Sequence, residues 1–552
     1  MGELNTAELL VKCLENEGVE YVFGLPGEEN LHILEALKFS PIEFITTRHE
    51  QGAAFMADVY GRLTGKAGVC LSTLGPGATN LMTGVADANL DGAPLVAITG
   101  QVGTDRMHIE SHQYLDLVAM FEPVTKWNTQ IVRPSNTAEI IRKAFKIAQS
   151  EKPGAVHIDL PENIAAMEVG AATPIKPDKR ETIYASFRSF NTAASAISKA
   201  NNPIILVGNG AIRSQASEAL TEFATQLQIP VVNTFMGKGV IPYTHPLSLW
   251  TVGLQQRDVI SCAFDETDLV IAVGYDLIEY SPKKWNPQGK IPIIHIGETP
   301  AEIDSSYILL AEIVGDISDS LNEIGKRADR QDKATPHAIT LKSQIREEYK
   351  RYAKDEGFPI KPQKIIYDLR QVMGAEDIVI SDVGAHKMWM ARHYHCDAPN
   401  TCIISNGFAA MGIAIPGALA AKLVHPDKKV VAVTGDGGFM MNCQELETAL
   451  RVGTNFVTLI FNDDGYGLIE WKQIDQFGDS AFIKFTNPDF VKFAESMGLK
   501  GYRVKSADDL IPTLKTALAQ DVPAVIDCPV DYTENLRFSQ KSGDLSCNLP
   551  QA

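Results

Sequence analysis

The chain has 552 residues, of which 45% are hydrophobic and 21% charged, as expected for a globular enzyme of three or four domains. Lys plus Arg number 50 against 68 Asp plus Glu, and the resulting net charge of −18 argues against a nucleic-acid partner and favours a soluble protein. No apolar run reaches membrane length, the N-terminus lacks a signal pattern and the eight cysteines form no Cys-x-x-Cys pair, so we expect a cytoplasmic protein with free or buried thiols and no membrane contact.

Apolar runs alternate with helical patterns in three successive blocks. In the first block, strands are predicted near 20–24, 42–47, 67–73, 94–99 and 155–159. A linker-like sequence at 172–180 separates it from a second block, which has strands near 204 and 269. Another at 326–335 separates the second block from a third. Because strands that alternate with helices form parallel sheets, we predict an α/β fold of three doubly wound parallel-sheet domains, over 1–170, 188–327 and 358–535.

The first block contains an acidic residue at a predicted helix start. Glu50 opens the helical sequence that follows Thr47-Arg-His, and its first turn is apolar and small. An acid in this position is commonly a capping charge, and that interpretation stays open beside a functional one. Two Gly-Pro turns, 23–27 and 74–80, follow apolar runs of the same block.

The third block contains two acids that follow neighbouring strands. Asp436 ends the apolar run 429–434 within Gly435-Asp-Gly437, and Asp463 follows the run 456–461. Their separation leaves room for one helix, from Gln444 to Val452, before the chain returns as a parallel strand. Both acids should then lie at the carboxyl edge of the sheet, where open α/β sheets bind ligands. Hard oxygen ligands beside tight glycine turns suit Mg²⁺ that holds a diphosphate, although two unrelated strand-end turns would give the same pattern.

Together, the Gly435-Asp-Gly437 and Asn462-Asp463 pair and the upstream His49-Glu50 helix start resemble the thiamine-diphosphate enzymes, most closely their acetolactate-synthase branch. Asp463 departs from the pattern of many members, which carry a second Asn, but it keeps an oxygen ligand. The resemblance implies pyrimidine-binding, central and diphosphate-binding domains in that order. It also implies that Glu50 is catalytic, because its carboxyl would face N1′ of the aminopyrimidine and promote loss of the C2 proton.

The resemblance further implies sets of binding residues. Metal ligands would be the side chains of Asp436 and Asp463 and the carbonyl of Gly465. Cofactor contacts would come from the glycine turns, from Glu50 and from apolar residues that support the bent cofactor; they are Gly27, Glu50, Asn80, Met388, Met411, Gly435, Gly437, Gly438 and Tyr466. His386 and Lys387 are weaker candidates, and core packing is the alternative for Met411.

Flavin is not expected as a cofactor. In flavin-holding synthases the turn after the strand near 270 is rich in Arg and Asp, whereas here 274–280 has no arginine. Gly208-Asn-Gly210 is a lone Gly-x-Gly and only weak evidence for a dinucleotide. The implied cofactors are therefore thiamine diphosphate and Mg²⁺, in a homodimer or homotetramer with active sites at the dimer interface.

The resemblance implies that the substrate is a small 2-oxo acid, and several basic side chains bear on which acid it is. Lys472 lies on the helix predicted after the second metal ligand. By the resemblance, flavin-free acetolactate synthases carry a glutamine at this position. A polar loop near 103–116 adds further candidates, which are Arg106, His108, His112 and Gln113. A solvated lysine and an ordinary polar surface loop are the alternatives.

Cations near the donor site favour a dicarboxylic acid, so the sequence predicts an acetolactate-synthase-like decarboxylase that converts 2-oxoglutarate to succinic semialdehyde and CO₂. Acetolactate synthase, which condenses two pyruvates, is the close alternative. A non-catalytic relative would be expected to lack Glu50 or a metal ligand, and neither is missing.

Overall fold

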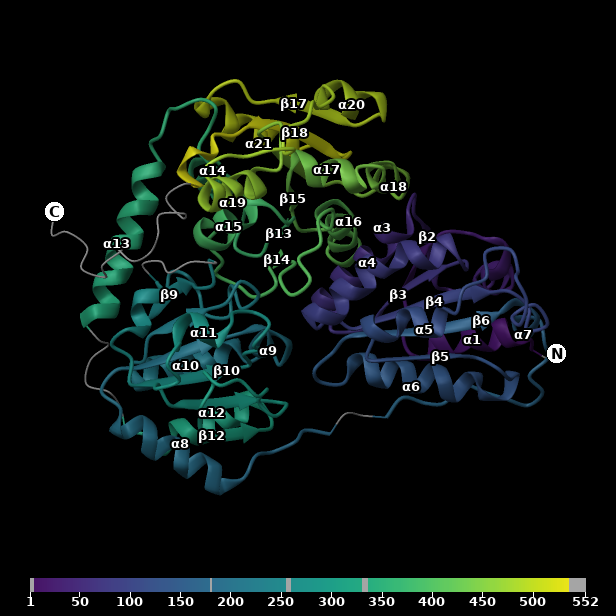
Figure 1. Cartoon of the computed structure of the whole chain (residues 1–552), viewed down its shortest axis with the longest axis horizontal. Helices are drawn as coiled ribbons and strands as arrows, with labels where there is room; N and C mark the ends of the chain where they lie inside the picture. The colour runs from purple at the N-terminus through teal and green to yellow at the C-terminus, as the bar shows by residue number, and fades with distance from the viewer. Residues whose placement is uncertain (1–3, 179–180, 255–259, 330–335, 536–552) are drawn as a thin grey trace. The chain divides into compact units, whose positions relative to one another are not determined.

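The computed structural model describes residues 4–178, 181–254, 260–329 and 336–535 (Figure 1). The chain divides into two compact units. The first comprises Met1–Arg180, Gly407–Asp427 and Met440–Asn455, and the second comprises the remaining segments. The first unit therefore contains two segments that the sequence assigned to the third block.

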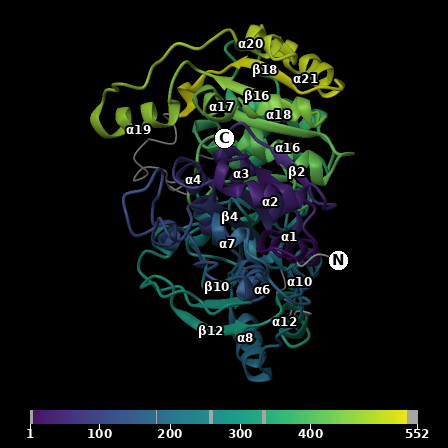
Figure 2. The same ribbon diagram turned by 90° about the vertical axis from the view of Figure 1, so that its right-hand side faces the viewer.

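The first unit is built on a six-stranded parallel sheet in the order β2-β1-β3-β4-β6-β5. Its strands are β1 Tyr21–Gly24, β2 Glu43–Thr46, β3 Gly68–Ser72, β4 Leu95–Gln101, β5 Trp127–Gln130 and β6 Ala155–Pro161. Its helices are α1 Thr6–Asn16, α2 Leu31–Leu37, α3 Glu50–Thr64, α4 Pro76–Asp91, α5 Leu117–Phe121, α6 Thr137–Gln149, α7 Glu162–Ala165, α16 Ala414–Val424 and α18 Glu445–Arg451. Within this unit, α16 packs against α3 (Figure 2).

The second unit carries two further parallel sheets. The central one has the order β12-β11-β10-β7-β8-β9. Its strands are β7 Pro203–Val207, β8 Val231–Asn233, β9 Ser248–Thr251, β10 Leu269–Val273, β11 Ile293–Gly297 and β12 Leu309–Val314. The accompanying helices are α8 Phe187–Lys199, α9 Asn209–Arg213, α10 Ser217–Leu227, α11 Pro282–Trp285, α12 Ile317–Gly325 and α13 Pro336–Tyr352.

The third sheet has the order β14-β13-β15-β16-β18-β17. Its strands are β13 Ile378–Ser381, β14 Cys402–Ile404, β15 Val430–Gly435, β16 Val457–Asn462, β17 Lys500–Arg503 and β18 Ala524–Pro529. The accompanying helices are α14 Pro362–Val372, α15 Ala385–His393, α19 Gly467–Phe477, α20 Phe490–Ser496 and α21 Leu510–Leu518, and α17 Asp436–Asn442 follows β15.

The strand orders confirm the predicted fold class and locate its switch points. Counted along their own strands, the first and third sheets both run 2-1-3-4-6-5, so these two blocks share one strand order. Their order reverses between the first and third strands, and such a reversal opens the crevice in which α/β sheets bind ligands. The central sheet instead has the order 3-2-1-4-5-6 of dinucleotide-binding folds.

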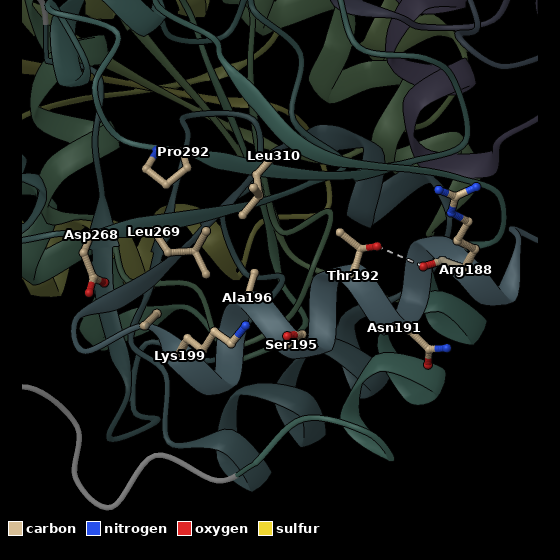
Figure 3. A pocket seen from close by; sticks show the side chains of 11 residues that line it. Arg188, Asn191, Thr192, Ser195, Ala196, Lys199, Asp268, Leu269, Pro292 and Leu310 are labelled. Atoms are coloured by element: carbon tan, nitrogen blue, oxygen red, sulfur yellow. Dashed lines mark hydrogen bonds between the residues drawn. The ribbon is translucent and has the colours of Figure 1, made fainter.

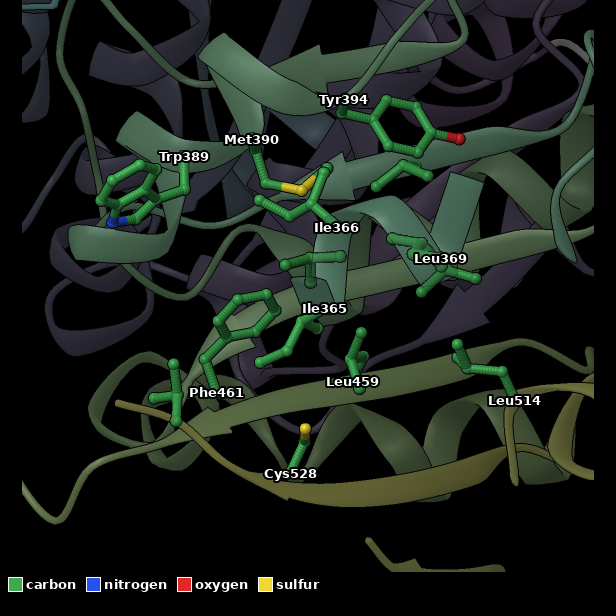
Figure 4. Packing of buried hydrophobic residues seen from close by; sticks show 14 of the residues in the cluster. Ile365, Ile366, Leu369, Trp389, Met390, Tyr394, Leu459, Phe461, Leu514 and Cys528 are labelled. Atoms are coloured by element: carbon green, nitrogen blue, oxygen red, sulfur yellow. The ribbon is translucent and has the colours of Figure 1, made fainter. Parts of the chain in front are cut away.

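Each sheet is stabilised by apolar side chains on its faces. In the third sheet, residues of α14, α15 and α21 pack on β16 and β18, with Ile365, Leu459 and Phe461 fully buried (Figure 4). Buried strands of this kind produce the continuous apolar runs from which the strands were predicted. No helix among the described residues is long and apolar enough to cross a membrane.

Three expectations needed correction. Strand β5 was not predicted, because Trp127-Asn-Thr-Gln130 is mostly polar and only half-buried. Two helices, α17 and α18, occupy the interval between Asp436 and Asp463, where one was predicted. Six cysteines are free and buried as expected, but Cys262 is disulfide-bonded.

Candidate active site

Two carboxylates lie at the ends of adjacent strands in the third sheet, as predicted. Strands β15 and β16 pair in parallel up to Gly435 and Phe461, so Asp436 and Asp463 emerge from neighbouring positions on one edge. Asp436 is fully buried and begins α17, where its Oδ1 accepts a hydrogen bond of 2.9 Å from the N–H of Gly437. The alternating strand pattern placed both acids correctly.

The electrostatics of this pair favour a nearby positive charge. Burial, followed by repulsion from Asp436, raises the pKa of Asp463 to about 8. Burial also raises the pKa of Asp436. Asp436 is buried and Asp463 half-buried. A divalent cation would stabilise two such carboxyls against their repulsion, and carboxylate oxygens are ligands that Mg²⁺ prefers. No group of three or more His, Cys, Asp or Glu able to hold a metal occurs within the described chain, so further ligands would be carbonyl and diphosphate oxygens.

Glycines around the two acids leave room only for hydrogen atoms. A Cβ on Gly437 would lie 2.7 Å from the ring of Tyr466, and one on Gly438 would lie 2.9 Å from Oδ2 of Asp382. Asp382 is itself buried and accepts a hydrogen bond of 3.0 Å from the hydroxyl of Thr434. Glycine is therefore required at both positions for the close packing of the chain around this turn.

His386 belongs to the same edge, although the sequence gave it little weight. Its ring lies beside Gly435, where an added Cβ would be 3.4 Å away. The side chain is buried, its Nε2 has no hydrogen-bond partner among the described residues, and burial lowers its pKa to about 3. Leaving a buried imidazole nitrogen without a partner is costly, which makes His386 a candidate for contact with a bound ligand.

The segment at 484–487 packs against the turn at 463–465, and no pattern in the sequence predicted this contact. Its backbone pairs with the turn, since the N–H of Phe485 bonds to the carbonyl of Asp464. The amide nitrogen of Asn487 lies 2.8 Å from Oδ2 of Asp436 and 3.0 Å from Oδ1 of Asp464. Lys484 donates to the carbonyl of Asp463 at 3.3 Å. These contacts fix the orientation of the proposed ligands.

The second group of predicted residues gathers at the switch point of the first sheet. Glu50 begins α3 as predicted and is 8% exposed, and its Oε2 accepts a hydrogen bond of 3.0 Å from Asn80. A Cβ on Gly77 would lie 3.3 Å from Oε1 of Glu50, so the first turn of α4 closes over the carboxyl. Thr73 contacts both this turn and Gly27, because added Cβ atoms on the two glycines would meet its side chain at 3.0 and 2.4 Å.

The polar loop at 103–116 is anchored beside this group. A Cβ on Gly75 would lie 2.7 Å from the carbonyl of Gln113, which places that residue against the α4 turn. The guanidinium of Arg106 lies 3.6 Å from Glu162 and donates to Ser111. That arginine is therefore partly neutralised. His108, His112 and Gln113 are exposed.

The remaining candidates lie in separate surroundings. Met388 is buried in the hydrophobic core of the third sheet, and Met411 is half-buried in a turn of the first unit. Lys472 is exposed on α19 and forms no ion pair or hydrogen bond with a described residue. The roles of these three residues stay predictions.

At the switch point of the central sheet, the side-chain carboxyl of Glu279 lies against the start of α9. Glu279 is buried, and its carboxylate accepts hydrogen bonds from the hydroxyl of Thr234 and, at 3.0 Å, from the N–H of Asn209. Burial raises its pKa to about 7. In sheets of this order the same position commonly receives the phosphates of a dinucleotide. The absence of flavin stays a prediction that this arrangement favours.

A groove of about 900 Å³ on the central domain lies at the opposite edge of its sheet (Figure 3). It is lined by the polar face of α8 and by residues at the amino ends of strands, where α/β sheets rarely bind ligands. Asp268, one of its charged residues, is already bonded to the N–H groups of Asn201 and Asn202. We therefore do not regard this groove as a candidate active site.

Comparisons with known proteins identify the family of the chain. Three thiamine pyrophosphate enzyme families match the chain: the N-terminal TPP binding domain over 4–120, the central domain over 190–324 and the C-terminal TPP binding domain over 382–528. The acetolactate synthase of Bacillus subtilis is 36% identical and aligns with 97% of this chain and 94% of its own length. A probable acetolactate synthase large subunit of Methanococcus aeolicus is 38% identical over 97% and 93%, and the catabolic acetolactate synthase of Raoultella terrigena is 35% identical over 96% and 95%.

Proposed function

Since the chain belongs to the thiamine-diphosphate enzymes of the acetolactate-synthase type, we propose that it decarboxylates a 2-oxo acid with thiamine diphosphate and Mg²⁺. The observation that carries the proposal is the repelling pair Asp436 and Asp463, together with His386, whose Nε2 has no partner in the described part of the chain. A cation and an anionic group together would satisfy all three side chains.

In this proposal the residues of the third sheet hold the cofactor. Asp436, Asp463 and the carbonyl of Gly465 would bind Mg²⁺, and the backbone at Gly435, Gly437 and Gly438 would hold the diphosphate, with Tyr466 next to Gly437. When bound, thiamine diphosphate supplies the electron sink that decarboxylation requires.

The residues of the first unit control proton transfer. Glu50 has one oxygen held by Asn80 and the other under the α4 turn, so its carboxyl keeps a fixed direction. We infer that it bonds to the aminopyrimidine, with Gly27 in the adjacent turn. Met388 and Met411 would contribute apolar contacts that exclude water from the reacting atoms. Active sites are proposed to form at the interface of a cytoplasmic homodimer or homotetramer.

Condensation of two pyruvates to 2-acetolactate and CO₂ is the reaction that the names of the relatives support. A second candidate is decarboxylation of 2-oxoglutarate to succinic semialdehyde and CO₂. The observation that favours it is Lys472, an exposed cation of α19 without an ionic partner among the described residues. Arg106 supports it less, because Glu162 already lies 3.6 Å from its guanidinium.

The test is purified protein with thiamine diphosphate and Mg²⁺, given pyruvate and 2-oxoglutarate separately, with the products identified. Lys472→Gln removes the charge and keeps hydrogen bonding, and Lys500→Gln is a control at another exposed lysine of the same domain. If 2-oxoglutarate is the substrate, the first variant should lower its kcat/KM by about 10- to 150-fold, which corresponds to roughly 1.5–3 kcal/mol. Acetolactate from pyruvate, unaffected by Lys472→Gln, would instead support acetolactate synthase. No turnover of either acid would refute the proposal.

A further inference from the structure

Glu445 stands out as a buried carboxylate that the proposed chemistry does not use. It begins α18, is 0% exposed and has no ion pair with any residue in the described part of the chain. Its hydrogen bonds instead reach a segment about 400 positions earlier in the sequence. Burial raises its pKa, while the donors around it act in the opposite direction. Burying a carboxylate costs stability unless hydrogen bonds replace its lost hydration.

The partners of Glu445 are the two residues immediately before Glu50. The N–H of His49 donates to Oε1 at 2.9 Å, and the N–H of Arg48 donates to both oxygens at 3.1 and 3.2 Å. The hydroxyl of Thr448 donates to Oε2 at 2.8 Å. A carboxylate offers only acceptors, so it suits adjacent N–H groups in a way that an amide does not.

Other contacts show that α18 grips the whole β2–α3 turn. Arg451 donates to the carbonyl of Thr46, and Glu447 pairs with the side chain of Arg48 at 2.6 Å. Figures 1 and 2 both draw α18 close to β2, within the first unit. The grip therefore extends from the end of β2 to the residue that caps α3.

Gly52 provides the room for this contact. A Cβ at that position would lie 2.7 Å from Oε1 of Glu445 and 2.9 Å from its Cδ and Cγ. Glycine inside a helix costs stability relative to alanine, so its presence in the first turn of α3 needs a packing reason. The carboxylate of Glu445 supplies that reason.

We propose that Glu445 is a positioning residue that holds the start of α3 and thereby fixes the direction in which Glu50 presents its carboxyl. The proposal rests on the proposed function, because it assigns Glu445 a purpose only if Glu50 acts on the cofactor. Glu50 is the first residue of α3, so a shift of Arg48 and His49 moves its Cα directly. Asn80 and the α4 turn would then meet the carboxyl in the wrong place.

The test compares Glu445→Gln and Gly52→Ala with wild type in the full-length protein. Glu447→Gln is the matched control, because Glu447 lies on the same helix but contacts only the exposed side chain of Arg48, so this variant leaves the backbone bonds from Arg48 and His49 to Glu445 in place. Glu50→Gln gives the rate of C2 exchange that is expected when the carboxyl of Glu50 is absent. Gly52→Ala pushes Glu445 from the opposite side while favouring the helix, so it remains informative if Glu445→Gln does not fold.

Three measurements are needed. Amide hydrogen exchange of the protein without cofactor should be faster at Arg48 and His49 in Glu445→Gln and Gly52→Ala than in wild type and Glu447→Gln. Affinity for thiamine diphosphate with Mg²⁺ should stay within about twofold. Deuterium exchange at C2 of the bound cofactor should fall at least about tenfold, because small misplacements of a catalytic group can cost on the order of 10²-fold.

The outcomes separate the two proposals. If wild type does not bind thiamine diphosphate, or if Glu50→Gln exchanges C2 as fast as wild type, the proposed function fails. If Glu50→Gln is slow but the foldable variants of Glu445 and Gly52 match wild type, the positioning role of Glu445 is refuted. Equal losses in cofactor affinity and C2 exchange would also refute it, because they indicate a general structural role.

Discussion

Glu50→Gln should leave the protein folded and able to bind cofactor while turnover falls by about 10²–10⁴-fold. The structural change is small. Oε2 of Glu50 accepts one hydrogen bond of 3.0 Å from Asn80, and a glutamine oxygen can accept the same bond. The expected loss of stability is therefore at most about 1 kcal/mol. The expected loss of rate corresponds to roughly 3–5 kcal/mol in activation free energy.

The assay measures kcat at saturating thiamine diphosphate and Mg²⁺, the cofactor dissociation constant and the midpoint of thermal unfolding. Glu29→Gln is a matched control, because Glu29 is also 8% exposed in the first unit and accepts a hydrogen bond of 2.6 Å from Thr73. That control should lose less than about tenfold in kcat, since no acid–base step is assigned to Glu29. The reasoning is wrong if Glu50→Gln keeps more than about a tenth of wild-type turnover, or if it loses cofactor binding and stability together.

Asp436→Ala should weaken thiamine diphosphate binding in the presence of Mg²⁺, because one carboxylate of the pair is lost, and Mg²⁺ should no longer raise the affinity. If titrations with and without Mg²⁺ give the same affinities as wild type, the ion is bound elsewhere. The purified protein should be active and colourless without added FAD, as expected from the arginine-free turn at 275–280, and a flavin absorption band at one per chain would contradict this. Burial raises the pKa of Asp159 from 3.8 to about 6, so the folded state retains this proton longer and stability should fall by up to about 3 kcal/mol as pH rises from about 4 to 6. Asp159→Asn should lack this fall, and a wild-type minus variant difference in thermal midpoint that rises with pH would have the wrong sign.

Local patterns in the sequence determined the positions of the principal acids. Apolar runs fixed where β15 and β16 end, and parallel pairing then required Asp436 and Asp463 to emerge on one edge. Glu50 was placed at a helix start for the same local reason. Strand β5 was missed because its residues are polar and half-buried, so its sequence lacks the apolar run of a central strand.

The partners of these acids depended on tertiary structure. Asn487 reaches Asp436 from a returning segment, and Glu445 reaches the turn before Glu50 across about 400 residues, so neither contact leaves a periodic signal in the sequence. His386 is buried and its Nε2 has no partner within the described residues, and neither property is visible in the sequence. Hydrophobic periodicity reports which face of an element is buried and where the element ends. Which polar groups meet at those ends follows from the packing of distant segments, and packing is a property of the folded chain.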